Sequence, residues 1–145
     1  MPTLTCIDRS GQTGEFTYSV AEGMADASGT EWTYRARPID GDPFGEFFEL
    51  TVTELSEDAV RVVMMANNDY APVSAKGIPD ALIPQVAAEL GRQVQSSPTT
   101  GGTADVRRSE DATKVWKRLV KKNLARYDES SDIYFTIPPE EKCST

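Results

Sequence analysis

Alternating apolar and polar residues predict an antiparallel sheet in the first half of the chain. Apolar side chains recur at about every second position in residues 31–39 (EWTYRARPI) and 44–55 (FGEFFELTVTEL), which is the period of a strand with one buried face. Residues 59–66 (AVRVVMMA) are almost continuously apolar, as in a central strand that is covered on both faces. Because short polar turns separate these segments, we expect an antiparallel meander.

Two segments closer to the amino terminus are also β-prone. Residues 3–7 fit a short strand, and a turn with two glycines follows them. Residues 16–27 (FTYSVAEGMADA) fit a strand that runs into a short helix, although Gly23 weakens the helical alternative.

Helical periodicity appears first in residues 78–90. An apolar face is formed by residues at four-residue spacing, namely Ile78, Leu82, Val86 and Leu90. Gly91 is suited to end this helix. Pro84 lies one turn inside it, which predicts either a kink or a regular helix that begins only there.

A second helix is expected after a cap at Ser109. Its apolar side is predicted to hold Ala112, Val115, Trp116, Leu119 and Val120, and its wet side Lys114, Lys117, Arg118, Lys121 and Lys122. Asn123 is a candidate end for it. Residues 92–97 are predicted to form a short parallel strand, residues 125–128 and 132–137 a final hairpin, and residues 138–145 a disordered tail.

Together these elements predict one α+β (mixed α/β) domain over residues 1–137, with a twisted mixed sheet of about six to seven strands and two main helices. Residues 59–97 read as strand, glycine turn, helix and strand, which is a βαβ unit. A glycine turn that opens a helix directs backbone N–H groups and the positive end of the helix dipole toward an anion such as phosphate. The alternative is an ordinary turn in which Gly77 supplies a positive φ.

Composition restricts the chemistry. The chain has 145 residues and no histidine, which excludes Ser-His-Asp and Cys-His catalysis and the usual zinc sites. Cys6 and Cys143 lack metal-ligand spacing, and two free thiols are favoured over a disulfide. We see neither a signal peptide nor an apolar run of about 18 residues, so we expect a soluble cytoplasmic protein without membrane contact.

Charge is distributed unevenly. Residues 107–126 carry eight Lys or Arg and two acidic residues, which gives this segment a net charge of +6. The whole chain has a net charge of −8, so the other 125 residues have a net charge of −14. The candidate anion or partner face consists of Arg107, Arg108, Lys114, Lys117 and Lys121. Its ligand is a phosphate group, an acidic protein or a nucleic acid, unless it is simply a solvated helix face. The acidic remainder disfavours nucleic acid.

The order of meander, glycine turn, helix, short strand, helix and hairpin resembles the GNAT superfamily of N-acyltransferases over about residues 30–137. In that family the motif R/Q-x-x-G-x-G/A binds the pyrophosphate of acetyl-coenzyme A through backbone amides. Residues 76–82 (KGIPDAL) resemble KGIGxAL, and residues 108–125 resemble the following helix. The resemblance implies acetyl transfer from acetyl-coenzyme A to an amine, with the sheet opening beyond Met65 for the pantetheine arm. The implied cofactor-binding residues are Lys76, Gly77, Ile78, Asp80 and Ala81.

Three positions differ from the family pattern. Ser74 replaces the motif arginine or glutamine, Pro79 replaces the second glycine, and Trp116 stands where a tyrosine that protonates the departing thiolate is usual. No catalytic residue is therefore assigned. The alternative is a catalytically inactive GNAT-fold protein, bacterial or phage, that acts by binding a protein partner or as a homodimer.

An acceptor cleft is predicted at the carboxyl end of the central strand. Its candidate residues are Asn67, Asn68 and Asp69, because open sheets bind ligands at such ends. A polar loop that simply ends the strand is the competing interpretation. Trp116 is expected in the core rather than in catalysis, and Glu49 and Glu54 are expected to face solvent rather than to act as bases.

Overall fold

A computed structural model describes residues 2–7, 10–24, 29–39, 47–66, 77–98 and 110–137. The elements follow one another as β1 (Thr3–Ile7), β2 (Thr13–Met24), β3 (Thr30–Pro38), β4 (Phe48–Ser56), β5 (Ala59–Ala66), α1 (Ile78–Leu90), β6 (Gln93–Gln95), α2 (Glu110–Lys121), β7 (Ala125–Asp128) and β8 (Ile133–Thr136). The predicted mixed α+β class is confirmed. Neither helix is long and apolar enough to cross a bilayer, a finding that covers the described residues.

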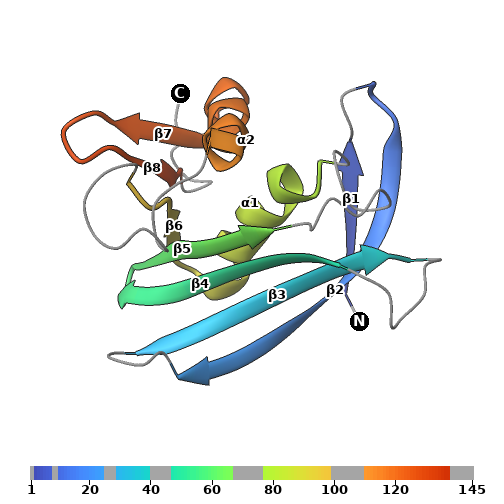
Figure 1. Ribbon diagram of the computed structural model, residues 1–145, viewed down its shortest axis with the longest axis horizontal. Helices are drawn as coiled ribbons and strands as arrows, with labels where there is room; N and C mark the ends of the chain where they lie inside the picture. Colours follow the sequence, from blue (N-terminus) through green and yellow to red (C-terminus); the bar gives the residue numbers. More distant parts are fainter. Residues whose placement is uncertain are drawn as a thin grey trace.

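The strands form one sheet of eight strands in the order β1-β2-β3-β4-β5-β6-β8-β7 (Figure 1). Strands β1 to β5 are antiparallel neighbours, as the meander predicted, and β6 lies parallel to β5. The last strand, β8, lies between β6 and β7. The expected count of six to seven strands was therefore too low.

The prediction that residues 16–27 run into a short helix is wrong for the residues up to Met24. Strand β2 stays extended from Thr13 and pairs with β3 up to Met24 and Thr30. This pairing joins the backbone N–H and C=O groups of the segment to a neighbouring strand, which outweighs its weak helical pattern. Residues 25–27 lie outside the described residues.

The core lies between α1 and one face of the sheet. Alternate residues of the meander point to this face, and Tyr34, Leu50 and Val60 are almost completely buried there. They meet the apolar side of α1, of which Ile78, Leu82, Ile83 and Val86 are fully buried. The two-residue period of the strands and the spacing of about four residues in α1 thus identify the residues on the two sides of one core.

Helix α1 begins at Ile78 and continues through Pro84, so the alternative start at Pro84 is wrong. Gly91 ends α1 with φ 62°, and the N–H of Arg92 donates to the carbonyl oxygen of Ala87. Helix α2 ends in the same way at Asn123, whose φ is 61°. In both cases a left-handed residue lets the following N–H groups bond to the last carbonyls of the helix.

Candidate functional site

The parallel strands β5 and β6 separate toward their carboxyl ends. Their pairing runs from Ala59 with Gln93 to Arg61 with Gln95, whereas β5 continues to Ala66. At the point of separation, the Oγ of Ser97 donates to the carbonyl oxygen of Val62 at 2.7 Å. We call the part of β5 beyond this bond, residues 63–66, the opening, because no described strand pairs with it on the side of β6. The predicted position beyond Met65 lies within it.

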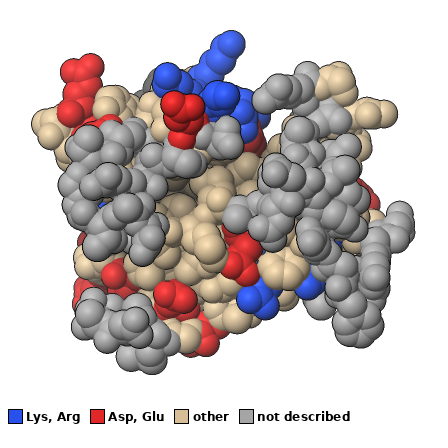
Figure 2. Space-filling model, in the orientation of Figure 1, with Lys and Arg blue, Asp and Glu red and all other residues tan. Residues whose placement is uncertain are grey.

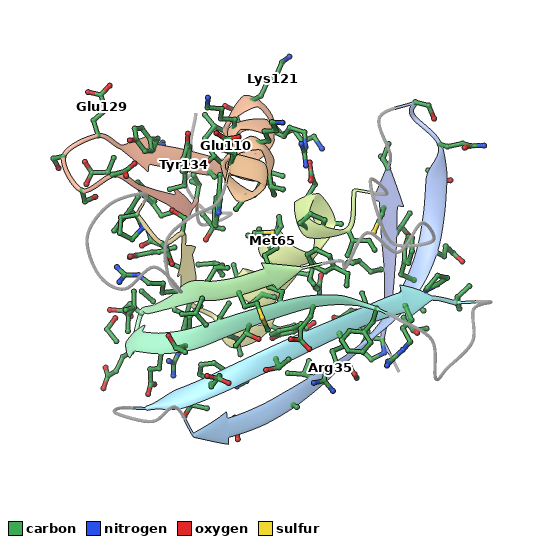
Figure 3. All side chains as sticks on the ribbon, viewed as in Figure 1. Arg35, Met65, Glu110, Lys121, Glu129 and Tyr134 are labelled. Carbon is green, nitrogen blue, oxygen red and sulfur yellow. The ribbon has the colours of Figure 1, made fainter. Side chains whose placement is uncertain are left out.

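The amino end of α1 packs against β1, where Gly77 meets the backbone of Ile7. Gly77 is the N-cap residue, no side chain caps the helix, and Pro79 occupies its first turn. Pro79 has no N–H, so the backbone donors of this turn come from its neighbours. The side chain of Met65 points from β5 toward the helices and packs against the core (Figure 3).

Gly77 has two structural reasons to be glycine. Its φ is 77°, in the left-handed region. A Cβ at this position would also lie 2.1 Å from the carbonyl oxygen of Ile7, far closer than atoms approach. Strand β1 thus packs directly on the start of α1, and the ordinary-turn interpretation explains this residue without a phosphate.

Asp80 is a buried acidic residue in the first turn of α1. Its carboxylate accepts two hydrogen bonds from Arg118 of α2, at 2.8 Å from Nε and 2.9 Å from Nη2. The Nζ of Lys122 lies 3.7 Å from the same carboxylate, whose side chain is only 8% exposed. The hydrogen bond from Arg118 to Asp80 raises the pKa of the guanidinium. Asp80 therefore fastens α1 to α2.

Arg118 lies on the wet side of α2, as predicted, with 42% of its side chain exposed. Its guanidinium turns back to Asp80, 38 positions earlier in the chain. The sequence contains one sign of this ion pair, the position of Asp80 in the first turn of α1. An acidic residue is expected there in any case, because it interacts favourably with the helix dipole. Nothing local identifies the partner of such a long-range pair.

Trp116 is a core residue, as predicted. It is fully buried and stacks on Tyr134 of β8, with ring centroids 6.1 Å apart and an interplanar angle of 18°. Its Nε1 has no hydrogen-bond partner among the described residues. An indole N–H does not release a proton in the way that a phenol does, so it offers no acid for a departing thiolate.

The remaining predicted residues fall into three groups. Ser74, Lys76, Arg107, Arg108, Asn67, Asn68 and Asp69 lie outside the described residues. Lys114, Lys117 and Lys121 are exposed on α2, where basic side chains gather at the top of the molecule (Figure 2). Lys121 points away from the body (Figure 3). Ile78 is fully buried and Ala81 is half-buried, and the N–H of Ala81 bonds to the carbonyl oxygen of Gly77.

The two candidate carboxylates of the meander are paired with arginines. Glu49 accepts a hydrogen bond from Arg35 at 2.9 Å and is 17% exposed, so it is less open to solvent than predicted. Glu54 accepts one from Arg92 at 2.7 Å, and this hydrogen bond is the main reason that the pKa of Glu54 is lowered. Both carboxylates are engaged in cross-strand or strand-to-helix ion pairs.

Two buried groups near α1 titrate far from neutral pH. Burial, followed by the charge of Asp80, raises the pKa of Cys6 to about 11. Burial, followed by its hydrogen bond to Glu89, raises the pKa of Tyr18 to about 12. Both groups therefore remain protonated at pH 7 and offer no nucleophile or base there. Cys6 is unpaired, as expected for a free thiol.

A cavity of about 830 Å³ lies at the opposite, amino end of β5 and β6. Small residues of α1, Ala87 and Ala88, line it together with Gln93, Gln95 and Ile137. Thr136 also lines the cavity, and its Oγ1 accepts a hydrogen bond from the N–H of Val94. No sequence pattern indicates this cavity, since alanine and glutamine are common at ordinary helix and strand positions.

Comparison of the chain with family models, characterised proteins and solved structures finds no match. Groups of at least three His, Cys, Asp or Glu suited to a metal ion are also absent from the part of the chain that the structure describes. The functional proposals below therefore depend on the geometry of the opening and on the sequence motifs.

Proposed function

We propose that the chain binds acetyl-coenzyme A in the opening between β5 and β6 and transfers the acetyl group to an amine. The observation that carries this proposal is the parallel pair that ends at Arg61 and Gln95 while β5 continues to Ala66. Beyond Arg61, β5 is paired with β4 on one side, and no described strand pairs with it on the other. A strand with such a free side offers backbone N–H and C=O groups to an extended ligand with amides, such as the pantetheine arm.

The start of α1 supplies the second element of the proposed site. The helix dipole and the N–H groups around Gly77 favour the negative charge of a pyrophosphate. Gly77, Ile78, Asp80 and Ala81, with Lys76, are the residues that the motif assigns to this contact. In transfer, the amine nitrogen would attack the thioester carbonyl carbon and the C–S bond would break. The proton lost by the nitrogen would pass, directly or through water, to the departing thiolate.

Calorimetry with acetyl-coenzyme A tests binding directly. We expect saturable heat at submillimolar ligand, and no heat at millimolar ligand would contradict the proposal. A Lys114→Glu, Lys117→Glu, Lys121→Glu variant, titrated with acetyl-coenzyme A and its 3′-dephospho form, shows whether the basic face of α2 contacts the 3′-phosphate. Release of free thiol in the presence of amines then tests transfer separately from binding.

Specific observations favour a second candidate, a binding protein of this fold without catalysis. Asp80 is engaged by Arg118, Gly77 is packed against Ile7, and Trp116 is in the core. Each residue thus has a structural role that does not require a coenzyme. In this candidate the exposed lysines of α2 contact an acidic protein partner.

The same charge-reversal variant tests the second candidate. Partner capture by the natural chain and its loss in the variant, without coenzyme binding by either, would support a protein-binding role. Equal capture by both would argue against a contribution of the basic face.

A further inference from the structure

The two edges of the sheet are chemically different. The edge strand β7 (ARYD) carries an arginine and an aspartate, and charged side chains on an edge discourage pairing with another chain. The other edge strand, β1 (TLTCI), has no charge, no proline and no irregularity in its pairing with β2. Over Thr3 to Thr5, before the contact of Ile7 with Gly77, β1 therefore lacks a charge, a proline or a bulge that would protect an edge.

The hydrogen-bonding direction of each β1 residue follows from its register. Tyr18 donates to the carbonyl oxygen of Pro2, and Thr3 is opposite Thr17. Backbone groups alternate in direction along an antiparallel strand, so Leu4 and Cys6 point their N–H and C=O groups toward β2. Those of Thr3, Thr5 and Ile7 point outward.

Thr3 and Thr5 form the accessible part of this outer edge. Both are exposed, and neither has a hydrogen bond from its outward backbone groups to any described residue. Ile7 differs, because its carbonyl oxygen lies against Gly77. The free edge is therefore centred on Leu4.

We propose that β1 pairs with β1 of a second copy of this chain, antiparallel and with the two-fold axis at Leu4. In this register Thr3 lies opposite Thr5 of the second copy, and each such pair exchanges both of its N–H···O bonds. Leu4 meets its own counterpart on the core face, and threonines pair on the other face. Threonine–threonine and apolar cross-strand pairs both stabilise a sheet.

The choice of a second copy as partner follows from the strand itself. A two-fold axis at Leu4 brings identical, uncharged strands together without opposing like charges directly. The nearest charged residue on β2 is Glu15, which is opposite Thr5. In the dimer, both copies of β1 would lie between this Glu15 and Glu15 of the second copy. The net charge of −8 on each chain opposes association, so dimerisation is expected to strengthen as salt rises.

Thr5→Pro tests the proposal without removing a bond of the β1–β2 ladder, because the N–H of Thr5 points outward. Sedimentation of the natural chain is expected to show a dimer of twice 15.9 kDa. The variant should raise the dimer dissociation constant about tenfold or more, since it removes an N–H donor from each chain. A natural chain that remains monomeric, or a variant that dimerises equally well, would overturn the proposal.

Thr5→Lys provides a second variant if proline perturbs folding. Lysine at the edge should weaken the dimer, whereas Thr13→Lys, the same change on the exposed neighbouring strand β2, should leave it intact. Equal dimerisation of both lysine variants would contradict the role of β1.

Disulfide formation tests the register. In a Cys143→Ser background, Thr3→Cys and Thr5→Cys proteins should form a cross-linked dimer when mixed, because hydrogen-bonded pairs have Cα atoms about 5.5 Å apart. Neither protein should cross-link alone to a comparable extent. Cross-linking of Thr5→Cys alone would place the axis at Thr5 and overturn the register.

Discussion

The two ends of α1 are built from the same residue types but in opposite environments. Each end has a left-handed glycine and an arginine–carboxylate pair. At the amino end Gly77 is packed against Ile7, and the Asp80 carboxylate, 8% exposed, is held by two hydrogen bonds. At the carboxyl end Gly91 has nothing within 4 Å of an added Cβ. The pair there, between Arg92 and Glu54, is 22% and 30% exposed.

This difference shows that the amino end of α1 is a fixed junction. Strand β1, α1 and α2 meet there, whereas the carboxyl end borders the cavity and solvent. The residues that the motif assigned to a cofactor are therefore also the residues that hold three elements together. Substitutions at the two ends should separate these roles.

The largest effect is expected from Gly77→Ala. A non-glycine residue in the left-handed region and a backbone clash together should cost about 3–4 kcal/mol of unfolding free energy. Gly91→Ala is the matched control, with a similar φ but open space, and should cost only about 1–2 kcal/mol. Urea unfolding of both variants measures the difference. Equal losses would mean that the contact with Ile7 contributes nothing.

Asp80→Ala should destabilise the fold by about 3 kcal/mol, because it removes two charged hydrogen bonds and leaves Arg118 without its partner. The double variant with Arg118→Met should be much less unstable than the sum of the single changes. Additive losses in such a cycle, followed by urea unfolding, would show that the two side chains do not interact.

Alkaline pH should lower the free energy of unfolding through Cys6, on the strand β1 that packs against the amino end of α1. The pKa of Cys6 is about 11 in the folded chain and 9.0 for an ordinary cysteine. The unfolded state thus loses its proton first, and stability falls as pH rises from about 9 to 11. In a Cys143→Ser variant, Cys6 should have about 100-fold less thiolate at pH 8 than a free thiol. Labelling with a disulfide reagent, with unfolded protein as control, measures this protection. Equally fast labelling of the folded protein would contradict it.

Glu54→Gln should have the smallest effect. Its ion pair is partly exposed and screened by solvent. The lowered pKa of Glu54 means that its contribution is present above the ordinary value of 4.5 and is lost as pH falls below it. The difference in Tm between variant and natural chain should therefore be small at pH 7 and vanish in acid. A difference that persists in acid would require another cause.

The local elements of this fold were predictable because their signals are local. Periodicity gave the limits of β1, β5 and α1, and left-handed Asn123 was a suitable end for α2. The extended course of β2 was missed because its segment fits two periods, and the pairing with β3 decides between them. The sequence contains no comparable local signal for pairing across a sheet.

The candidate site was predictable only in outline. The strand–turn–helix order placed Gly77 and Asp80 at the amino end of α1 correctly. Their contacts depend on Ile7 and Arg118, which are distant in the chain, so residue spacing does not reveal them. The opening between β5 and β6 likewise depends on a side chain, Ser97, which the sequence did not distinguish from its neighbours.

The bond from Ser97 to Val62 also limits the length of the opening. A strand that loses its neighbour leaves its next carbonyl oxygen without a donor, and here a hydroxyl supplies the donor at the first such position. The series of hydrogen bonds between β5 and the segment after β6 therefore ends at a defined bond, from Ser97 to Val62. Substituting alanine for Ser97 would leave that oxygen available to an incoming amide and lengthen the unoccupied edge of β5 by one position. The spacing of β5 and β6 would limit how wide an extended ligand can be. The hydroxyl oxygen of Ser97 would limit how far along β5 that ligand can reach.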